Sequence, residues 1–409
     1  MIKLFDPFVL LLWLLGSLAF FYFAYFGFMI HEAKKPANIQ KARVFPRISL
    51  IIPTFNEESV ILRKLLNLED MVYPKDKMDI IFVDSGSTDN TIQILRSFMN
   101  KNPNRFRLLV QSQRFGKASA LNYAVKHAKG DIVFMTDADA ILDKNAIEKI
   151  VENFNDPVIG AVTGELFILN SDQSSITKLE KSYRSFYEFI RMGESNLDST
   201  PIFNGPITAF RKELFDDLKL DTVTDDIELC IRIREKGYRA VYEPESIAYE
   251  YAPTSMKSRM KQKSRRAQGA IQSLIRHRHL LFNSKYGKYG LVIFPCEFFM
   301  HIISPILILF LVLSLVVVTL GNSVLTVSMI VFIAVLVGGL TLFLLVSKIL
   351  MPGKIITINP IDILVTFITL QASLILGFFA LVLGQKSYKW EKIDDVRIVS
   401  KSKENMEMS

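Results

Sequence analysis

A pair of carboxylates directly after a short apolar run is the clearest chemical signal in this chain. Asp137 and Asp139 are separated by one residue and follow the apolar residues 132–135. Two carboxylates this close repel each other unless a cation or a hydrogen-bond donor lies between them. Such oxygen ligands suit Mg²⁺ or Mn²⁺, which bind through one or two carboxylates together with substrate phosphates. The pair therefore predicts a metal site, in preference to a plain polar turn after a buried strand.

A second acidic pair opens a predicted helix. Thr224, Asp225 and Asp226 precede the helical pattern of residues 227–235. An ordinary helix cap explains one acidic residue at such a position, but not two. A carboxylate that stays ionised at a helix N-terminus can act as a general base towards a hydroxyl group. Asp226, with Asp225 beside it, is therefore the candidate catalytic residue.

Polar residues also follow the first two predicted strands. Pro53, Thr54 and Glu57 come at the end of the first strand, and Asp84 ends the second, where serine and glycine residues follow. Short polar groups beside a glycine allow a ligand to approach the backbone closely. These residues could form half of a pocket for a base and a ribose, while helix capping is the alternative explanation.

Basic residues near these positions could bind phosphate. Lys117 enters a predicted helix directly after a glycine, and a solvated surface lysine is an equally good explanation for it. Gln262, Arg265 and Arg266 lie on another predicted helix, within residues 251–296, which contain no acidic residue. A spacing of three puts Gln262 and Arg265 on one helix face. This stretch could hold a diphosphate or lie against anionic lipid headgroups, and its place before an apolar run argues against nucleic acid.

Short apolar runs alternate with amphipathic segments between residues 48 and 250. This order is typical of an α/β domain with a mostly parallel sheet, in which ligands bind beyond the carboxyl ends of the strands. The predicted strands are residues 48–53, 79–84, 106–111, 131–136, 160–168 and 239–242. The predicted helices between them are residues 57–70, 89–99, 117–129, 144–153 and 172–191.

Long uncharged runs at both ends predict a membrane protein with four spans. The chain has 409 residues, half of them hydrophobic, and a net charge of +8. A span needs roughly 20 apolar residues, and the runs that meet this need are residues 8–30, 298–320, 322–347 and 363–385. Basic residues after the first run predict that the catalytic domain is cytoplasmic and the protein a multi-pass protein of the cell membrane. Four crossings would then place the C-terminal tail outside, although this tail is rich in lysine.

The chain therefore divides into five predicted parts. They are an N-terminal anchor (1–31), a catalytic domain (45–250), basic interfacial helices (251–297), three further spans (298–385) and a polar tail (386–409). Cys230 and Cys296 lie far apart in the sequence and lack the spacing of a metal site.

Taken in order, these motifs resemble the membrane-bound, inverting family 2 glycosyltransferases, specifically the processive branch with cellulose, hyaluronan and poly-N-acetylglucosamine synthases. The resemblance covers residues 48–272 and extends loosely into the spans. It implies a GT-A-like fold and a nucleoside diphosphate sugar, UDP-linked in that branch, as the donor. It also implies Mg²⁺ or Mn²⁺ as cofactor, a glycan or lipid acceptor, and contact with membrane lipids.

The resemblance further implies a role for each motif residue. Asp84, Thr54 and Glu57 match residues that contact the uridine, and Asp139 matches the usual metal ligand. Asp226 is similar to the base of the Thr-Glu-Asp motif. The other matches are Asp137, in the motif of the metal ligand, Gly205 and Pro206, in an acceptor-side loop, and Gln262 and Arg265. Pro53 beside Thr54 and Lys117 near the diphosphate complete the expected donor site.

One position departs from the family pattern, because Arg266 replaces the tryptophan of Gln-x-x-Arg-Trp. The tryptophan of those synthases helps to form an acceptor platform, so its replacement bears on processivity. Two acceptors therefore compete: a growing β-linked polysaccharide that is translocated, or a lipid such as a polyprenyl phosphate or a ceramide-like molecule that receives one sugar. A non-catalytic scaffold or a transporter is the weakest alternative, because every expected carboxylate is present and His301 is the only ionisable side chain in the three C-terminal runs.

Overall fold

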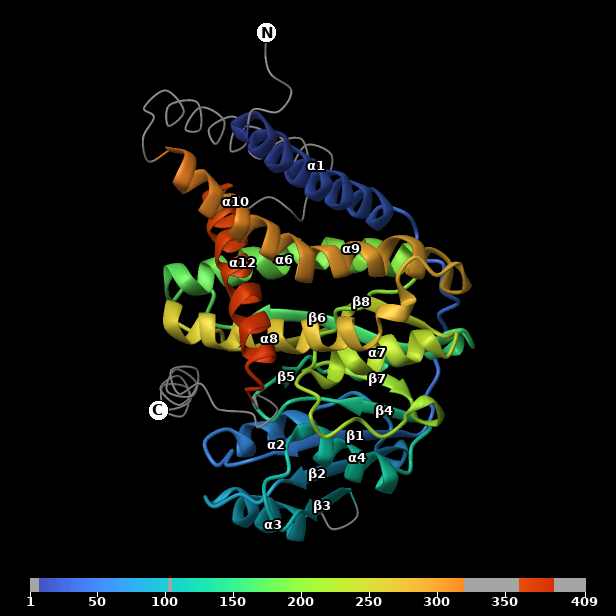
Figure 1. Ribbon diagram of the computed structural model, residues 1–409. Helices are drawn as coiled ribbons and strands as arrows, with labels where there is room; N and C mark the ends of the chain where they lie inside the picture. The colour runs from blue at the N-terminus through green and yellow to red at the C-terminus, as the bar shows by residue number, and fades with distance from the viewer. Residues whose placement is uncertain (1–6, 102–104, 320–359, 386–409) are drawn as a thin grey trace.

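The computed structural model describes residues 7–101, 105–319 and 360–385. A single sheet of eight strands lies between two sets of helices, and further long helices extend away from one side of it (Figure 1). The strands are β1 (Ile48–Thr54), β2 (Met78–Asp84), β3 (Phe106–Val110), β4 (Ile132–Met135), β5 (Ile141–Leu142), β6 (Ile159–Ile168), β7 (Thr208–Arg211) and β8 (Arg239–Glu250). Their order in the sheet is β3-β2-β1-β4-β7-β6-β8-β5.

The first half of the sheet is parallel. β1 pairs in parallel with β2 and β4, and β2 pairs in parallel with β3. Thr54 lies opposite Asp84, and Asp84 lies opposite Val110. The carboxyl ends of these strands therefore meet at one edge, where an open α/β sheet binds its ligands.

The second half of the sheet is mixed. β6 and β8 are parallel to each other, whereas β7 is antiparallel to both β4 and β6, and β5 is antiparallel to β8. The sequence does not predict β5 and β7, because β5 has only two residues and β7 lacks the continuous apolar run that marks β4. β7 nevertheless lies near the middle of the sheet and joins its two halves.

Helices cover both faces of the sheet. Those of the α/β domain are α2 (Ile61–Glu69), α3 (Thr91–Lys101), α4 (Lys117–His127), α5 (Ala146–Val151), α6 (Ser175–Leu197) and α7 (Asp225–Glu235). Alternate strand residues point to opposite faces, so Ile51 and Val133 pack in one apolar core with α4, and Leu50 and Phe134 pack in the other with α2. The α/β class with a mostly parallel sheet is thus confirmed.

The ends of the elements differ from the predicted ones where tertiary contacts decide them. The helix expected from residue 57 begins at Ile61, because Asn56 has a φ of 54° and the Glu57 N–H donates to Oγ1 of Thr91 at 2.7 Å. The last predicted strand continues from residue 242 to Glu250, because it pairs with β6 along its whole length. The helix predicted over residues 172–191 continues as α6 to Leu197, because its second half packs on α1 (Pro7–Ala33).

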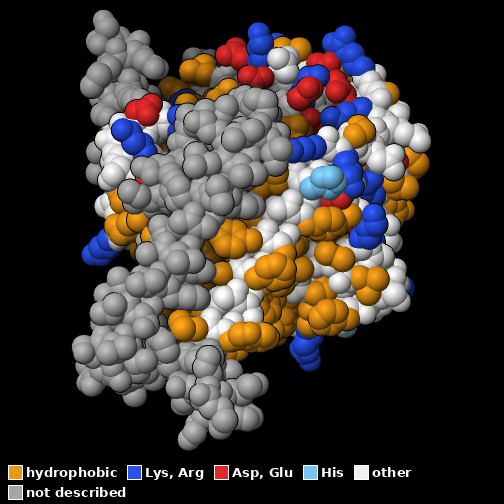
Figure 2. Space-filling view, turned by 90° about the horizontal axis from the view of Figure 1, so that it is seen from above, with side chains coloured by type: hydrophobic (Ala, Val, Ile, Leu, Met, Phe, Trp, Pro, Cys, Tyr) orange, Lys and Arg blue, Asp and Glu red, His pale blue; other side chains and the backbone are white. Residues whose placement is uncertain are grey.

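Three described helices are long and apolar enough to cross a membrane. The candidate spans are Leu11–Ala33 within α1, Tyr289–Ser314, and Leu364–Val382 within α12 (Pro360–Val382). The predicted span over residues 322–347 and the polar tail lie outside the described residues. Many large hydrophobic side chains of the candidate spans are exposed, among them Trp13, Phe20 and Phe310. Figure 2 shows such side chains gathered over much of the face seen from above, with charged side chains towards one edge.

The second candidate span begins earlier than residue 298, where the sequence places it. Short π-helical segments and α9 (Phe294–Phe298) continue from Tyr289 directly into α10 (Ser304–Thr319). Glu297 interrupts the uncharged run of the sequence, but its side chain is only 1% exposed and pairs with Nδ1 of His301 at 3.1 Å. A charge that finds its partner inside the protein does not meet lipid, so it is compatible with a span.

The candidate spans pack tightly on two helices that flank the sheet. A Cβ added at Gly193 of α6 would lie 2.1 Å from the carbonyl oxygen of Met29 in α1. A Cβ at Gly377 of α12 would lie 2.7 Å from the backbone nitrogen of Gln268 in α8 (Met256–Arg276). Backbones approach this closely only where the side chain is a hydrogen atom. The candidate spans and the α/β domain are therefore joined by direct backbone contact.

α12 ends beside the α/β domain. The side-chain amide of Gln268 donates to the carbonyl oxygen of Gln385 at 3.0 Å, and in Figure 1 α12 descends past α8 towards the sheet. α1 also reaches the domain with its C-terminal end, where Asn196 of α6 donates to the carbonyl oxygen of Glu32 at 3.1 Å. Both helices thus have their C-terminal ends on the domain side.

Candidate active site

A pocket lies at the carboxyl edge of the parallel strands, between the sheet and α8. Its walls come from the ends of β1 and β4, the start of α4, the loop before β7, the start of α7 and the middle of α8. The lining residues are Pro53, Thr54, Phe55, Ser85, Arg114, Gly116, Lys117, Ala120, Asp137, Ala138, Gly205, Pro206, Val223, Thr224, Asp225, Asp226, Arg265 and Arg266. Most of the residues singled out from the sequence therefore surround one cavity. Glu57, Asp84, Asp139 and Gln262 are not among its lining residues.

The register of β7 brings two distant motifs together. Met135, the last residue of β4, lies opposite Thr208, the first residue of the antiparallel β7. Asp137 follows β4 and the Gly205-Pro206 loop precedes β7, so both segments leave the sheet at the same edge. A parallel β7 would have carried this loop to the far edge.

Lys117 stands between two carboxylates of the pocket. Its Nζ lies 3.0 Å from Oδ1 of Asp137 and 3.3 Å from Oδ2 of Asp225. Burial opposes its charge, but Asp137, Asp225 and Asp226 raise the pKa of the lysine above its usual value. Burial likewise opposes ionisation of Asp137, yet Lys117 holds the pKa of Asp137 below its usual value. The sequence leaves open whether this lysine is a surface residue, and the structure places it inside the pocket.

Asp226 has the environment of a general base. Its side chain is 9% exposed, and burial together with the charge of Asp225 raises its pKa to about 6, against the attraction of Arg266 and Lys117. A base works best when its pKa lies near the operating pH. A Cβ added at Gly205 would lie 3.2 Å from Oδ2 of Asp226, so the glycine leaves one side of this carboxylate open.

Thr224 does not act as a side-chain cap for α7. It occupies the N-cap position without a side-chain hydrogen bond to the helix. Instead it packs on α8, where a Cβ added at Gly269 would lie 2.3 Å from Cγ2 and 2.5 Å from Oγ1 of Thr224. The capping alternative thus does not account for this threonine, which marks a close contact between the two helices.

α8 supplies two of the positively charged side chains of the pocket. Arg265 and Arg266 both line it. Burial and the charge of Arg266 lower the pKa of Arg265, while Glu250 and Asp226 raise the pKa of Arg266 against the effect of its burial. Gln262 lies one turn earlier, half-buried and outside the lining. The spacing of three predicts that Gln262 and Arg265 reach one site, and of the two only Arg265 lines this pocket.

Asp84 holds the neighbouring loops together from behind the pocket wall. Its fully buried carboxylate accepts from Oγ1 of Thr54 at 3.1 Å, from the N–H of Ser87 at 2.8 Å and from Oγ of Ser87 at 2.5 Å. Glu57 is also fully buried. Of Asp84, Glu57 and Thr54, only Thr54 lines the pocket. Asp84 therefore shapes the wall from behind, by holding Thr54 and the neighbouring Ser87 in place.

Lys64 is a candidate residue that the sequence analysis does not identify. Its Nζ, fully buried on α2, donates to Oγ1 of Thr136 and to the carbonyl oxygen of Ala140, both at 2.8 Å. Burial lowers its pKa to about 7, although Asp137 and Asp139 attract its charge. Lys64 thereby ties down both ends of the loop that carries the two aspartates. A signal exists in the sequence, because Ile61, Lys64, Leu65 and Leu68 share one face of the helix.

Phe55 and Arg114 form another part of the wall that the sequence analysis does not assign. The guanidinium carbon of Arg114 lies 4.1 Å from the centre of the Phe55 ring. Both residues line the pocket beside Thr54 and Ser85. An arginine over an aromatic face makes a flat wall, which suits a planar base.

The acidic pair fits a hard divalent cation. Asp137 faces the pocket, where the ammonium of Lys117 already lies against one of its oxygens, and Asp139 is half-buried two residues further on. Over the described ranges, these two acids have no third histidine, cysteine or acidic residue close enough to complete a three-ligand group. A cation held here would therefore take its other ligands from substrate phosphates and water, as Mg²⁺ and Mn²⁺ do.

Comparison with known proteins agrees with this geometry. Residues 49–219 match the family model Glycosyl transferase family 2. The chain is 30% identical over 279 residues to a poly-beta-1,6-N-acetyl-D-glucosamine synthase of Staphylococcus aureus (strain COL), an alignment that covers 67% of this chain and 66% of the relative. The synthase of that name from Staphylococcus epidermidis is 29% identical over the same length. The chain thus spans about two thirds of the length of these curated relatives.

A solved structure extends the likeness to the membrane helices. It is the mannosyltransferase PcManGT from Pyrobaculum calidifontis in complex with GDP-Man and Mn²⁺, with a TM-score of 0.74 and 26% identity. The match covers 92% of this chain and 99% of that one. Together with the matching family model and the pocket of acidic and basic residues, these similarities show that the chain is a glycosyltransferase of family 2 with the GT-A-like fold.

Proposed function

We propose that this enzyme transfers a sugar from a nucleoside diphosphate sugar, UDP-linked, to a growing β-linked polysaccharide at a membrane. The observation that carries the proposal is the buried Asp226, with a pKa of about 6, in one pocket with Lys117, Asp137 and Arg265. Glycosyl transfer requires a general base and positively charged side chains that bind the donor phosphates, all in one cavity. The curated synthases named above support a polymer as the product.

The two halves of the pocket have different tasks in this proposal. The end of β1 and β2 receives the nucleoside, with Pro53, Thr54, Glu57 and Asp84 shaping that part. Lys117, Asp137, Arg265 and Arg266 face the diphosphate, and Gln262 lies one turn before Arg266 on α8, outside the lining. Gly205 and Pro206 lie on the acceptor side, because Gly205 borders the carboxylate of Asp226.

Asp139 would hold the cation, with Asp137 beside it. Bound Mg²⁺ or Mn²⁺ supplies charge stabilisation to the leaving diphosphate. Lys117 then exchanges part of its contact with Asp137 and Asp225 for the phosphate oxygens. Arg265 adds a second positive charge from the opposite wall, and its fixed guanidinium suits phosphate geometry.

The transfer itself is an in-line displacement. Asp226 accepts the proton of the acceptor hydroxyl, whose oxygen forms a bond to the anomeric carbon as the bond between that carbon and the donor phosphate breaks. The nucleoside diphosphate leaves with the bonding electrons, and Lys117 and Arg265 stabilise its charge. Attack from the side opposite to the leaving group inverts the anomeric centre and turns an α-linked donor into a β-linkage.

Asp226→Asn tests the assignment of the base. The variant keeps the side-chain volume but cannot accept a proton, so we expect transfer to fall by at least ~10²–10⁴-fold, as for the loss of a general base. Binding of UDP-sugar, measured by calorimetry, should stay within a few-fold of the original. Asp217→Asn is a matched control, because Asp217 is half exposed and pairs with Lys126 at the surface. An Asp226→Asn enzyme that transfers sugar at the normal rate would refute the role.

A lipid acceptor is the second candidate function. Arg266 lines the pocket where the polymer synthases have tryptophan, and a guanidinium suits the phosphate of a polyprenyl phosphate better than it suits a sugar platform. The near full-length match is to a protein named as a mannosyltransferase, in complex with GDP-Man, and not as a polymer synthase. Sizing the products made from labelled donors by purified enzyme in lipid nanodiscs separates the two functions. A ladder of long glycan supports the polymer, and one labelled lipid species supports the alternative.

The orientation in the membrane is also part of the proposal. Lys34, Lys35, Lys41 and Arg43 follow the end of α1, and an excess of basic residues marks the cytoplasmic side of a span. The catalytic domain then faces the cytoplasm of the cell, where nucleoside diphosphate sugars are made.

A further inference from the structure

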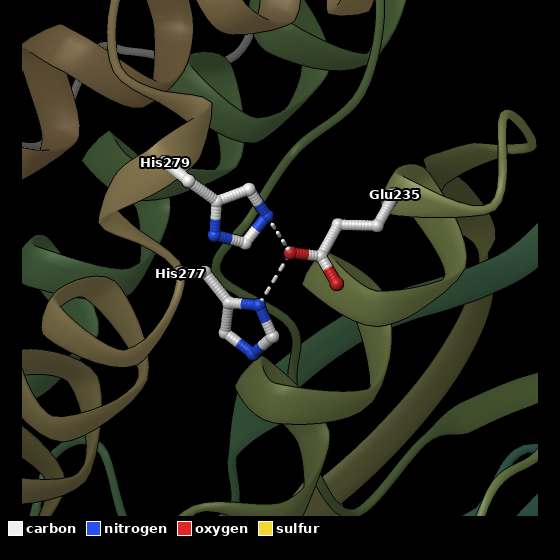
Figure 3. A group of neighbouring side chains, drawn as sticks. All are labelled: Glu235, His277 and His279. Carbon is white, nitrogen blue, oxygen red and sulfur yellow. Dashed lines mark hydrogen bonds and ion pairs between the residues drawn. The ribbon is translucent and has the colours of Figure 1, made fainter.

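Two histidines and a glutamate converge away from the catalytic pocket. Glu235 is the last residue of α7, His277 follows the last residue of α8, and His279 lies in the short 3-10 helix Arg278–Leu280. Oε1 of Glu235 lies 2.6 Å from Nδ1 of His277 and 2.8 Å from Nε2 of His279. Figure 3 shows both imidazoles turned towards this one carboxylate oxygen.

The chemistry of these three groups is that of a transition-metal site. One ligand atom from each residue lies within 4.8 Å of the others, and two imidazole nitrogens with one carboxylate oxygen are a common ligand set for zinc. We propose that Glu235, His277 and His279 form a binding site for a divalent transition metal, Zn²⁺ in the first place, separate from the cation of the catalytic pocket. The ligands are borderline donors that favour Zn²⁺ over Mg²⁺, in contrast to the all-oxygen pair Asp137 and Asp139.

A second carboxylate prepares His277 for this role. Oε1 of Glu228 lies 3.2 Å from Nε2 of His277. Glu228 is itself fixed, because its Oε2 accepts from Oγ of Ser273 at 3.0 Å and pairs with Arg276 at 3.3 Å. A histidine whose Nε2 donates to a carboxylate presents its Nδ1 lone pair to a metal. Such a carboxylate behind a ligating histidine is a regular part of zinc sites.

The exposure of the three side chains suits a site that exchanges its metal with solvent. The His277 side chain is 8% exposed, that of Glu235 21%, and that of His279 58%. The buried His277 and the partly buried Glu235 provide a fixed platform, and the exposed histidine leaves space on the solvent side for a water ligand. The pairing with Glu235 by itself stabilises the position of the exposed His279 side chain only weakly, since exposed pairs of this kind contribute about 0–1 kcal/mol.

A metal at this place would join two helices that build the catalytic pocket. α7 carries Asp225 and Asp226 at its start and Glu235 at its end, and α8 carries Arg265 and Arg266 before it reaches His277. At 1.5 Å per residue, the metal would lie roughly 13–18 Å from those catalytic positions along each helix. It would therefore link the C-terminal ends of α7 and α8 and would not touch the substrate.

Metal titration of the full chain tests the proposal. The purified protein in lipid nanodiscs is stripped with a chelator and titrated with Zn²⁺ in excess Mg²⁺, which occupies oxygen-only sites, while calorimetry records stoichiometry and affinity. Co²⁺ titration gives an independent signature, because nitrogen-ligated tetrahedral cobalt absorbs in the visible range. We expect one Zn²⁺ per chain to bind at this site and to raise the melting temperature, since a ligand that binds only the folded state stabilises it.

Three variants locate the site. His279→Ala removes the exposed ligand without changing the core, and it should abolish the cobalt band and the thermal shift. Glu228→Gln keeps the ligands but weakens their support, and we expect a loss of ~10–100-fold in affinity. His127→Ala is the matched control, because His127 is an exposed histidine on α4, far from the group in sequence. Equal Zn²⁺ affinity and an equal cobalt spectrum in the original chain and in His279→Ala would overturn the proposal.

Discussion

At the scale of single residues, the charges around Asp226 set the pKa of its carboxyl group. Burial and Asp225 raise this pKa to about 6, and Arg266 and Lys117 oppose the rise. In its proposed role as the base, Asp226 is therefore ionised at neutral pH and takes up a proton in mild acid. Arg266 is one of the groups that favour its ionised form, so its charge bears on the proposed base whatever the acceptor is.

The first prediction concerns the pH dependence of the reaction. At saturating donor and acceptor, the rate should fall as the pH drops below about 6, where Asp226 takes up a proton. Arg266→Met removes a positive charge that favours the ionised carboxylate of Asp226. The acid limb of the pH–rate profile, the range in which the rate falls with falling pH, should therefore move to higher pH. Lys126→Met, at a surface lysine that pairs with Asp217, should leave the limb in place. An unchanged acid limb in Arg266→Met would show that another group controls it.

The second prediction concerns Lys64, which anchors the loop of the two aspartates. Lys64→Met leaves Oγ1 of Thr136 and the carbonyl oxygen of Ala140 without their donor, at a cost of about 1–3 kcal/mol for each buried group left unsatisfied. We expect a lower melting temperature and weaker binding of donor with Mn²⁺. The surface variant Lys126→Met should change stability by less than about 1 kcal/mol. Full stability and normal donor binding in Lys64→Met would contradict an anchoring role.

At the scale of the elements, the distance between α7 and α8 fixes the geometry of the pocket. α7 places the two acids, α8 places the two arginines, and the helices meet where Gly269 lies against Thr224. A glycine at this point lets the guanidinium groups reach the same cavity as the base. A larger residue would push the walls apart.

The third prediction tests this contact. Gly269→Ala puts a Cβ 2.3 Å from Cγ2 of Thr224, and such overpacking costs about 1–3 kcal/mol. We expect a lower melting temperature and a reduced transfer rate, although alanine favours an isolated helix by about 1 kcal/mol. Gly16→Ala in α1 has no atom within 4 Å of the added Cβ and serves as the control, with stability unchanged or slightly higher. Equal changes in melting temperature and transfer rate in the two variants would show that the contact between Gly269 and Thr224 does not set the geometry of the pocket.

At the scale of the whole molecule, the candidate spans pack directly on the helices that build the pocket. α12 crosses α8 with backbone contact at Gly377 and ends at a second cavity next to the pocket, lined by Gln268, Leu381 and Gln385. An acceptor or a product at this edge would meet both the interfacial helix and the last candidate span. The arrangement explains how a reaction on soluble donor can be coupled to a membrane.

The fourth prediction concerns the side of the C-terminus. Because Gln385 lies beside α8, a cysteine at Gln385→Cys should react with an impermeant label from the same side as one at Lys35→Cys, after the end of α1. A cysteine at Asp362→Cys, near the start of α12, should react from the opposite side, as a helix of 23 residues is about 34 Å long. Cys230→Ala and Cys296→Ala provide the background. Labelling of Gln385→Cys from the side of Asp362→Cys would refute this topology.

This placement bears on the prediction of four spans. Four crossings would put the lysine-rich tail opposite the catalytic domain, whereas the structure brings the last described residue, Gln385, to the domain. α1 and α12 thus both end at the domain, while the number of spans stays a prediction, since residues 322–347 lie outside the described residues. Counting apolar runs does not show where these two helices end, because the end of a helix is placed by its tertiary partners and not by its composition.

The sequence by itself determined the fold class, the strands of the parallel half and most of the residues that line the pocket. It could do so because short apolar runs and polar residues at strand ends are local patterns, and the ends of parallel strands share one edge. Only the tertiary structure decided that Lys117 lies between Asp137 and Asp225, that Lys64 supports the acidic loop, and that Glu57 and Asp84 stay behind the wall. It also decided the place of β7 and of the Glu235, His277 and His279 group. These features depend on contacts between residues that are far apart in the chain, which no local pattern encodes.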